Sequence, residues 1–315
     1  MDVGSNTVHL LVATLEPEGL TARLHAVEMV NLGHEVTSRG QLGPELIAHT
    51  AALVAGMVAL ARQQAAQSIG LVATEAIRNA PDATALREEV KRLSGESLRV
   101  LTGEAEARLS YLGATAFKVS SGQPATVADV GGGSTEVVQG LGTRPRNGTS
   151  LKLGSDQLLG TVQANDPLTG RQQVHAEARV SMILEAVPRG DDPGLLLATG
   201  GTASNLPVLL GQRAAAVEAV ELGLRPEVGE PWTVLRRADV ERARDLAMSQ
   251  TSADLAAATG LSAKRARLMS GGVLILLGLL DRYRAEELTV TERGLRDGVL
   301  LALAAARNRS APKPR

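Results

Sequence analysis

Two short segments of this sequence combine an acidic residue, glycine and hydroxyl side chains in the same order. Residues 2–7 read Asp-Val-Gly-Ser-Asn-Thr, and residues 129–135 read Asp-Val-Gly-Gly-Gly-Ser-Thr. A glycine-rich turn lets backbone N–H groups converge without obstruction by a Cβ atom, and such a concavity binds phosphate. We therefore predict two phosphate loops, whose contact residues are Gly4, Ser5, Asn6, Thr7, Gly131, Gly132, Gly133, Ser134 and Thr135.

The acidic residues that open the two segments, Asp2 and Asp129, cannot bind phosphate directly because like charges repel. A carboxylate beside a phosphate is favourable when a hard cation lies between the two groups. Asp129 and Asp2 are therefore candidate ligands of Mg²⁺ or Mn²⁺. For either segment alone, an ordinary glycine hairpin turn is the favoured interpretation, whereas the matched pair favours phosphate binding.

A third glycine motif, Thr-Gly-Gly-Thr-Ala-Ser at residues 199–204, follows an apolar strand pattern and precedes an expected helix at 205–210. Helix N-termini attract anions, so Gly200, Gly201 and Thr202 are further candidate phosphate contacts. A plain strand-to-helix turn is the alternative interpretation, and the motif alone does not separate the two.

Two glutamates and one arginine stand where they could act on a bound phosphate. Glu136 directly follows the second loop, and Glu106 lies one turn into the helix expected after Gly103, where an acidic residue is also favourable for the helix dipole. Arg78 follows a buried strand pattern, at the position where ligands bind in open α/β sheets. It is a candidate phosphate clamp or a surface residue. Arg296 is expected to be a packing or bridging residue.

Bulk composition excludes several classes of protein. The 315 residues carry a formal net charge of −1, contain no Cys, and include only 1% aromatic residues. Cysteine nucleophiles, disulfides and thiolate zinc sites are therefore excluded, and neither a basic surface nor a stacking platform for nucleic acid is expected. The longest apolar run, residues 271–280, is too short to span a membrane, and no signal peptide is seen. We predict a cytoplasmic protein without a nucleic-acid or membrane partner.

Strand and helix patterns alternate along the chain, which predicts the α/β class. The first half contains a hairpin pattern at 8–15 and 20–29, followed by helices at 44–66, 82–93 and 103–117. The pattern restarts with strands at 126–130 and 136–139, so the repeated loop indicates two related domains facing one another. Helices are also expected at 155–163, 172–187, 236–248, 263–283 and 295–306. A connection is expected at 212–234 and a disordered tail at 308–315.

These segments together resemble the exopolyphosphatase / guanosine pentaphosphate (pppGpp) phosphohydrolase family. The matching runs recur in family order: residues 2–11, 73–80, 103–109, 127–136, 198–202 and 294–298. The resemblance implies two actin-like, ribonuclease-H-like α/β domains around a central cleft, with domain I at 1–117 plus 295–315 and domain II at 118–294. It also implies Mg²⁺-dependent removal of terminal phosphate from polyphosphate or pppGpp, with Glu106 and Glu136 as catalytic residues.

The sequence departs from this family pattern at three places. Asp2 follows Met1, so the strand expected to lead into the first loop is missing. Asn31 stands where the family often has Arg. The chain stops after the two-domain core, which suggests action on shorter polyphosphate chains. The sequence leaves open a pppGpp phosphohydrolase, an ATP-dependent kinase of the same fold, and a nucleotide or alarmone sensor or scaffold. The apolar helix at 263–280 could serve either a core or a homodimer.

Overall fold

The computed structural model describes residues 1–17, 19–189, 192–213 and 232–310, and its internal contacts divide the chain into two units. Unit 1 contains Met1–Gly113 and the C-terminal helix α12 (Leu295–Ser310), and unit 2 contains the described residues between them. Along the described residues, the border between the units falls after Gly113 and again after Gly294.

Unit 1 is built on a five-stranded mixed sheet with the order β3-β2-β1-β4-β5. Strands β2 and β3 form the predicted hairpin, and β1, β4 and β5 run parallel to one another. The strands are β1 (Asp2–Val3), β2 (Thr7–Glu16), β3 (Gly19–Met29), β4 (Leu71–Ala73) and β5 (Leu98–Val100). The strand that we expected to be missing is therefore present as β1, two residues paired on both sides at the centre of the sheet.

Unit 2 is built on a six-stranded sheet with the order β10-β11-β9-β6-β7-β8. Its strands are β6 (Pro124–Val130), β7 (Thr135–Leu141), β8 (Arg144–Leu151), β9 (Leu195–Thr199), β10 (Trp232–Arg236) and β11 (Glu287–Thr291). Strands β6, β9 and β11 are parallel, whereas β7 and β8 continue from β6 as antiparallel strands.

The two sheets repeat one topology. Reading β8-β7-β6-β9-β11 in unit 2 reproduces β3-β2-β1-β4-β5 in unit 1, with the same pairs antiparallel and the same pairs parallel. The phosphate loops connect equivalent strands, β1 to β2 and β6 to β7. The repeat seen in two short motifs therefore extends over five strands of each unit, and the predicted α/β class is confirmed.

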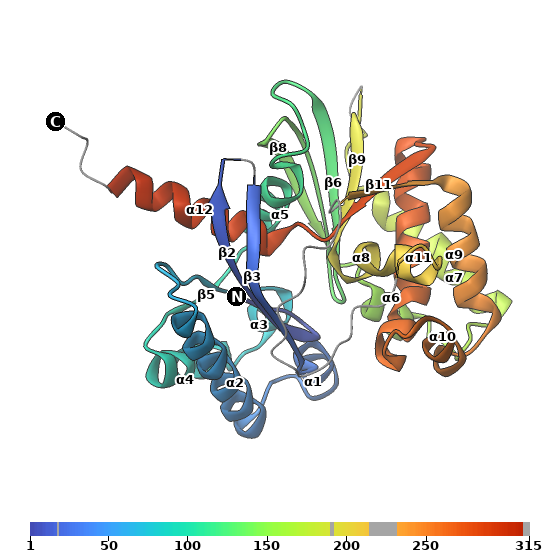
Figure 1. Ribbon diagram of the computed structural model, residues 1–315. Coiled ribbons are helices and arrows are strands. Elements are labelled where there is room, and N and C mark those ends of the chain that lie inside the picture. The colour runs from blue at the N-terminus through green and yellow to red at the C-terminus, as the bar shows by residue number, and fades with distance from the viewer. Residues whose placement is uncertain (18, 190–191, 214–231, 311–315) are drawn as a thin grey trace. The chain divides into compact units, whose positions relative to one another are not determined.

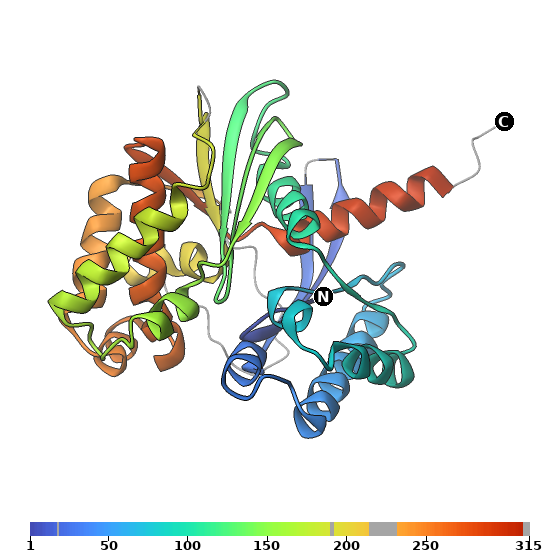
Figure 2. The ribbon, with the colours of Figure 1, turned by 180° about the vertical axis from the view of Figure 1, so that it is seen from behind.

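Helices complete each unit (Figure 1). In unit 1, α2 and α4 pack against each other beside the sheet, and in unit 2, α7, α9 and α11 gather on one side of the sheet (Figure 2). The unit 1 helices are α1 (Leu32–Arg39), α2 (Pro44–Gln63), α3 (Glu75–Asn79), α4 (Ala83–Ser94) and α5 (Gly103–Thr115). The unit 2 helices are α6 (Ser155–Thr161), α7 (Gly170–Leu184), α8 (Gly200–Leu209), α9 (Arg237–Ser249), α10 (Ser252–Thr259) and α11 (Ala263–Tyr283).

Both cores consist mainly of aliphatic side chains, as the low aromatic content predicts. Helix α11 is buried along most of its length, from Ala266 to Tyr283, within the core of its own unit. The apolar residues that could have served a dimer surface therefore pack inside unit 2. Burial of these side chains supplies the main stabilisation of the unit, because apolar area removed from water is the dominant favourable contribution to folding.

Helix α2 has the length and mean hydropathy, 1.5, of a segment that can cross a membrane, and it is the single such helix within the described ranges. A third of its most apolar window is buried inside the structure. Its buried face contributes Ile47, Val54, Met57 and Val58 to the core of unit 1, and core helices commonly have this composition.

Several elements differ from the sequence expectations for physical reasons. Helix α3 has five residues, too few to show a helical period, and β8 buries only its last residue, so it lacks an alternating apolar pattern. Helices α1 and α10 were also not foreseen. Helix α12 continues through Ser310, three residues into the expected disordered tail, whereas residues 214–231 and 311–315 of the expected connection and tail lie outside the described residues.

Candidate functional site

The two predicted phosphate loops adopt the same turn. In the first loop, Gly4 N donates a hydrogen bond to Thr7 O at 2.9 Å, and in the second, Gly131 N donates to Ser134 O, also at 2.9 Å. A Cβ atom would lie 3.4 Å from the acceptor oxygen at Gly4 and 3.1 Å from it at Gly131. The contact at Gly131 is tight, which favours glycine there, whereas the contact at Gly4 is an ordinary van der Waals distance.

The carbonyl groups of the first loop are bound by the segment that begins α1. Ser5 O accepts from Gly33 N at 2.7 Å, and Asn6 O accepts from Val30 N at 2.9 Å and Asn31 N at 3.2 Å. Asn31 has a left-handed backbone with φ 55°, which Asn tolerates better than most residues. Asn31, where the family often has Arg, therefore donates a hydrogen bond to the backbone of the first loop.

The second loop is held in an equivalent way by the start of α6. Gly132 O accepts from Asp156 N at 3.0 Å and Gln157 N at 3.1 Å, and Gly131 O accepts from Ser155 N at 2.9 Å. With their carbonyls bound behind them, the loops leave their amides available. The amides of Ser5, Asn6, Gly132, Gly133 and Ser134 have no hydrogen-bond acceptor among the described residues. Successive amides of this kind in a turn can bind an anion.

In unit 1, parallel pairing brings three chain segments to the same edge of the sheet. Strands β1, β4 and β5 are adjacent and parallel, so the loop after Val3, the segment after Ala73 and the segment after Val100 all leave the carboxyl edge. Ligands bind at this edge in open α/β sheets. The first phosphate loop, Arg78 and Glu106 therefore belong to one edge of one sheet.

Arg78 and Glu106 form a direct ion pair at this edge. Arg78 Nη1 donates to Glu106 Oε2 at 2.9 Å and to Leu101 O at 2.7 Å, and the Glu106 side chain is only 8% exposed. Among the described residues, Arg78 Nη2 and Nε make no further hydrogen bond. One nitrogen of the guanidinium thus orients the carboxylate while the others can still bind an anion. Glu104 and Arg108 form the expected exposed pair at 3.2 Å.

In unit 2, the third glycine motif packs on the end of β6. Asp129 pairs in register with Thr199, and a Cβ atom at Gly200 would lie 2.5 Å from Val130 O and 2.8 Å from Asp129 Oδ1. Gly200 has φ +90°, a conformation that favours glycine. The motif forms the first turn of α8 itself, so the expectation of a helix starting only at 205 is wrong. The close approach of the backbone places this helix N-terminus beside Asp129.

Glu136 occupies the first part of β7, opposite Asp129 in the strand register. Its side chain is buried, and Ser150 Oγ donates to Glu136 Oε1 at 2.7 Å. The repeat gives this position a counterpart in unit 1, because His9 pairs with Asp2 just as Glu136 pairs with Asp129. His9 Nδ1 contacts Arg296 Nη1, so Arg296 connects α12 to β2 within unit 1, in agreement with its expected packing role.

Sequence reasoning missed Arg265, which lies against the third glycine motif. A Cβ atom at Gly201 would lie 2.2 Å from Arg265 Nη1, so the guanidinium packs directly on this glycine and would have to move for a larger residue. Arg265 and Lys264 lie in the first turn of α11, where positive charges interact unfavourably with the helix dipole. Two basic residues at this unfavourable position are the feature of the sequence that could have indicated an anion site. Partial burial lowers the pKa of Lys264, and Asp156 partly opposes that shift.

The few oxygen donors at the loops suit a cation that takes most of its ligands from water molecules and from the phosphate groups of a substrate. The described part of the chain contains no group of three or more His, Asp or Glu residues able to enclose a metal. Mg²⁺ commonly uses only one or two protein carboxylates together with substrate phosphates. Asn6 Oδ1 is buried without a hydrogen-bond partner among the described residues, which adds an oxygen donor on the first loop.

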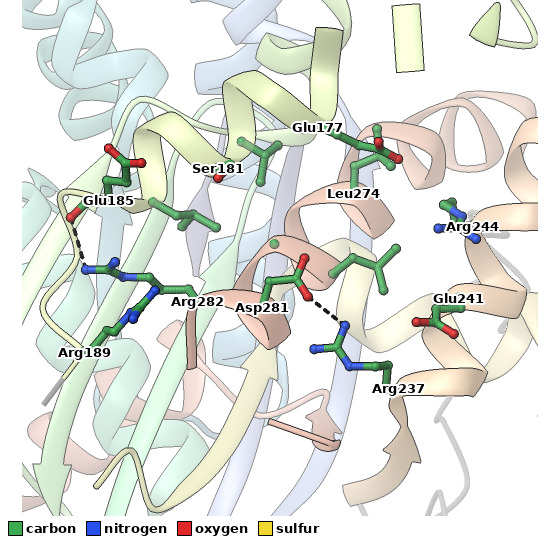
Figure 3. A pocket seen from close by; sticks show the side chains of 14 residues that line it. Glu177, Ser181, Glu185, Arg189, Arg237, Glu241, Arg244, Leu274, Asp281 and Arg282 are labelled. Carbon is green, nitrogen blue, oxygen red and sulfur yellow. Dashed lines mark hydrogen bonds and ion pairs between the residues drawn. The ribbon is translucent and has the colours of Figure 1, made fainter. Parts of the chain in front are cut away.

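A cavity of about 450 Å³ in unit 2 lies between α7, α9 and α11 (Figure 3). Charged side chains that line it already bind other groups of the protein. Arg237 pairs with Asp281 at 2.7 Å, and Arg282 Nη2 donates to Glu185 O at 3.1 Å. No residue of either phosphate loop lines it. This cavity is therefore separate from the predicted site.

Two α/β units that repeat one strand order, each with a glycine loop between equivalent strands, define a protein of the actin-like fold. The chain belongs to the Ppx/GppA phosphatase family, which matches residues 12–306. The resemblance carried by the sequence motifs is thereby confirmed.

Individual relatives cover nearly the whole chain. Exopolyphosphatase 2 of Mycobacterium tuberculosis is 29% identical, over 96% of this chain and 97% of that protein. Guanosine-5'-triphosphate,3'-diphosphate pyrophosphatase of Vibrio campbellii is 24% identical, over 95% of this chain but 58% of that protein. The crystal structure of the Aquifex aeolicus family member matches with a TM-score of 0.82 at 28% identity, over 98% of this chain and 97% of that one.

Proposed function

We propose that this protein is an exopolyphosphatase, which hydrolyses the terminal phosphoanhydride bond of inorganic polyphosphate. The observation that carries the proposal is the matched pair of loops, each with at least two amides that lack an acceptor among the described residues. The similarity to exopolyphosphatase 2 over 97% of that protein supports the same reaction. A chain of phosphates presents several anionic groups in sequence, and a duplicated phosphate loop suits such a ligand.

In the proposed mechanism, the loops bind and orient the terminal phosphoryl group. Glu106, with Glu136 assisting, orients a water molecule and accepts its proton. The water oxygen forms a bond to the terminal phosphorus, and the bond from that phosphorus to the bridging oxygen breaks. Orthophosphate leaves, and the chain is shorter by one phosphate. Catalysis of this kind depends mainly on positioning and on charge stabilisation.

Arg78 has two roles in this proposal. Through Nη1 it holds the Glu106 carboxylate in one orientation, and through its other nitrogens it can bind a phosphate oxygen. Asp129, and Asp2 in the other unit, are the proposed ligands of Mg²⁺ or Mn²⁺. Such an ion would neutralise phosphate charge that the loop amides alone leave uncompensated.

A pppGpp 5'-phosphohydrolase is the second candidate, because one relative, from Vibrio campbellii, is named for an activity on that nucleotide. The same loops and glutamates would serve both substrates, since the cleaved bond is a terminal phosphoanhydride in each. The length and base of the leaving group are what differ. A kinase would instead require a phosphate acceptor other than water.

The test is phosphate release from long-chain polyphosphate, short-chain polyphosphate, pppGpp and ATP, measured side by side with Mg²⁺, with Mn²⁺ and with a chelator. We expect metal-dependent release from polyphosphate without any added acceptor. A higher kcat/KM for pppGpp than for every polyphosphate length would move the assignment to the second candidate. Release from none of these substrates would reject both.

A further inference from the structure

The cavity between α7, α9 and α11 in unit 2 has an apolar floor and a charged rim (Figure 3). Its volume is about 450 Å³, and its floor consists of buried side chains, those of Val180, Leu184, Leu274 and Leu277. Four arginines and four acidic residues line the rim. The positions of these charges along the cavity decide which kind of molecule fits it.

Helices α7 and α11 run in the same direction along the cavity. A Cβ atom at Gly278 would lie 2.4 Å from Val180 Cγ1, and four residues further along α11, Arg282 Nη2 donates to Glu185 O at 3.1 Å. Glu177 precedes Glu185 on α7 by roughly 12 Å, because an α-helix rises 1.5 Å per residue. Glu177 and Arg282 therefore lie at opposite ends of the cavity, as Figure 3 shows.

Helix α9 runs in the opposite direction. Its first residue, Arg237, pairs with Asp281 near the end of α11 at 2.7 Å, and this pair is neutral as a whole. Near the other end of α9, Ala247 O accepts from Ser270 Oγ, in the first half of α11, at 3.2 Å. Glu241 lies between these two contacts, one helical turn beyond Arg237 in the direction of Glu177.

We call the part of the cavity lined by Arg189, Arg282 and Glu185 the arginine end. Among the described residues, Arg282 donates to the carbonyl oxygens of Val187 and Glu185, and no acidic side chain pairs with it. Arg189 follows Val187 by two positions, and its side chain has no hydrogen bond or ion pair within the described ranges. Two guanidinium groups against one carboxylate give this end an excess of positive charge.

We call the part lined by Glu177, Glu241 and Arg244 the glutamate end. Arg244 is neutralised by Asp245, whose Oδ1 accepts from Arg244 Nη2 at 2.9 Å. Glu177 Oε1 accepts from the uncharged amide of Gln173 at 3.0 Å, and the Glu241 carboxylate has no partner in the part of the chain that the structure describes. This end therefore has an excess of negative charge.

We propose that the cavity binds a linear zwitterion, with a carboxylate at one end, an ammonium group at the other and an aliphatic chain between them. The guanidinium groups of the arginine end bind the carboxylate, the glutamate end binds the ammonium group, and the apolar floor removes the chain from water. The two charges of a short amino acid such as glycine lie too close together to reach both ends. Polyphosphate has no cation for the glutamate end, so this site is distinct from the proposed substrate site.

The test is the Kd of the full chain for 6-aminohexanoate, measured by isothermal titration calorimetry beside hexanoate, hexylamine and glycine. Hexanoate and hexylamine each keep the aliphatic chain and only one of the two charges. We expect 6-aminohexanoate to bind at least threefold more tightly than each of the others, since one exposed ion pair changes affinity by roughly 1.4-fold to 5-fold. Equal affinity for hexanoate, hexylamine or glycine would overturn the proposal, as would no binding of any probe.

Two substitutions assign the ends of the cavity. Arg189→Gln should weaken binding of 6-aminohexanoate about threefold and leave that of hexylamine unchanged, whereas Glu241→Gln should weaken it about threefold and leave that of hexanoate unchanged. Arg242→Gln is the matched control, because this exposed residue adjoins Glu241 on α9 but does not line the cavity. The same loss for every probe, or in all three variants, would contradict the proposal. The comparison of probes in the unsubstituted protein does not depend on the folding of any variant.

Discussion

Arg78 Nη1 bridges Glu106 Oε2 and Leu101 O, at 2.9 and 2.7 Å. The bridge spans two neighbouring parallel strands, since Arg78 follows β4 and Leu101 follows β5. A carboxylate held in this way has a fixed direction, which a water molecule requires for in-line attack on phosphorus. The pair therefore connects the topology of the sheet to the proposed chemistry.

Replacing Glu106 by Gln tests the proposed general base. The substitution keeps the size of the side chain and removes the proton acceptor, so turnover of polyphosphate should fall about 10²–10⁴-fold. Glu104→Gln is the matched control, because that residue is two positions away and exposed. Turnover of Glu106→Gln within about threefold of the unsubstituted protein would make the role untenable.

Removing Arg78 tests its ion pair with Glu106. Arg78→Met removes the guanidinium that pairs with the buried Glu106 carboxylate, and should lower the free energy of unfolding by about 1–3 kcal/mol. Adding Glu106→Gln to that variant should restore part of the loss, because the buried carboxylate charge is then also removed. Thermal unfolding of the two single variants and the double variant gives the coupling. Strict additivity would contradict the pairing.

Gly200 and Gly160 provide a matched pair of glycine-to-alanine substitutions. Gly200→Ala introduces a Cβ 2.5 Å from Val130 O at φ +90°, so we expect a loss above about 2 kcal/mol in stability. Gly160, in α6, has nothing within 4 Å of the added atom, and Ala there should stabilise by about 0.5–1 kcal/mol. Denaturant unfolding compares the two. Equal effects would show that the close packing of α8 on β6 is absent.

The pH dependence of stability should report Tyr283. Burial raises the pKa of Tyr283 to about 12, from an ordinary value of 10.0. Because the pKa is raised in the folded state, the stabilisation by the neutral, buried phenol is intact below pH 10. That stabilisation is lost as the pH rises toward 12. Relative to Tyr283→Phe, the unsubstituted protein should lose about 2 kcal/mol over that range. A constant difference between pH 9 and 12 would contradict the burial of the phenol.

Much of this architecture follows from local sequence. The hairpin at β2 and β3, helix α11 and the restart of the pattern in the second half were predictable because turn residues and apolar periodicity act over a few residues. The two equivalent turns that we predict to be phosphate loops were recognisable for the same reason, since glycine-rich segments favour tight turns locally. The family resemblance supplied the roles of Glu106 and Glu136, which spacing alone did not.

Tertiary structure decided which of these residues meet. Arg78 and Glu106 are 28 positions apart in the sequence, and only the pairing of β4 with β5 brings them into contact. Arg265 reaches Gly201 because α11 packs against α8, and Arg293 lies over the ring of Phe117 although the two residues are far apart in the sequence. Such contacts depend on strand pairing and packing between distant segments. A local pattern cannot specify a contact with a distant segment, so the sequence by itself determined the two glycine turns, and the tertiary structure decided which residues lie beside them.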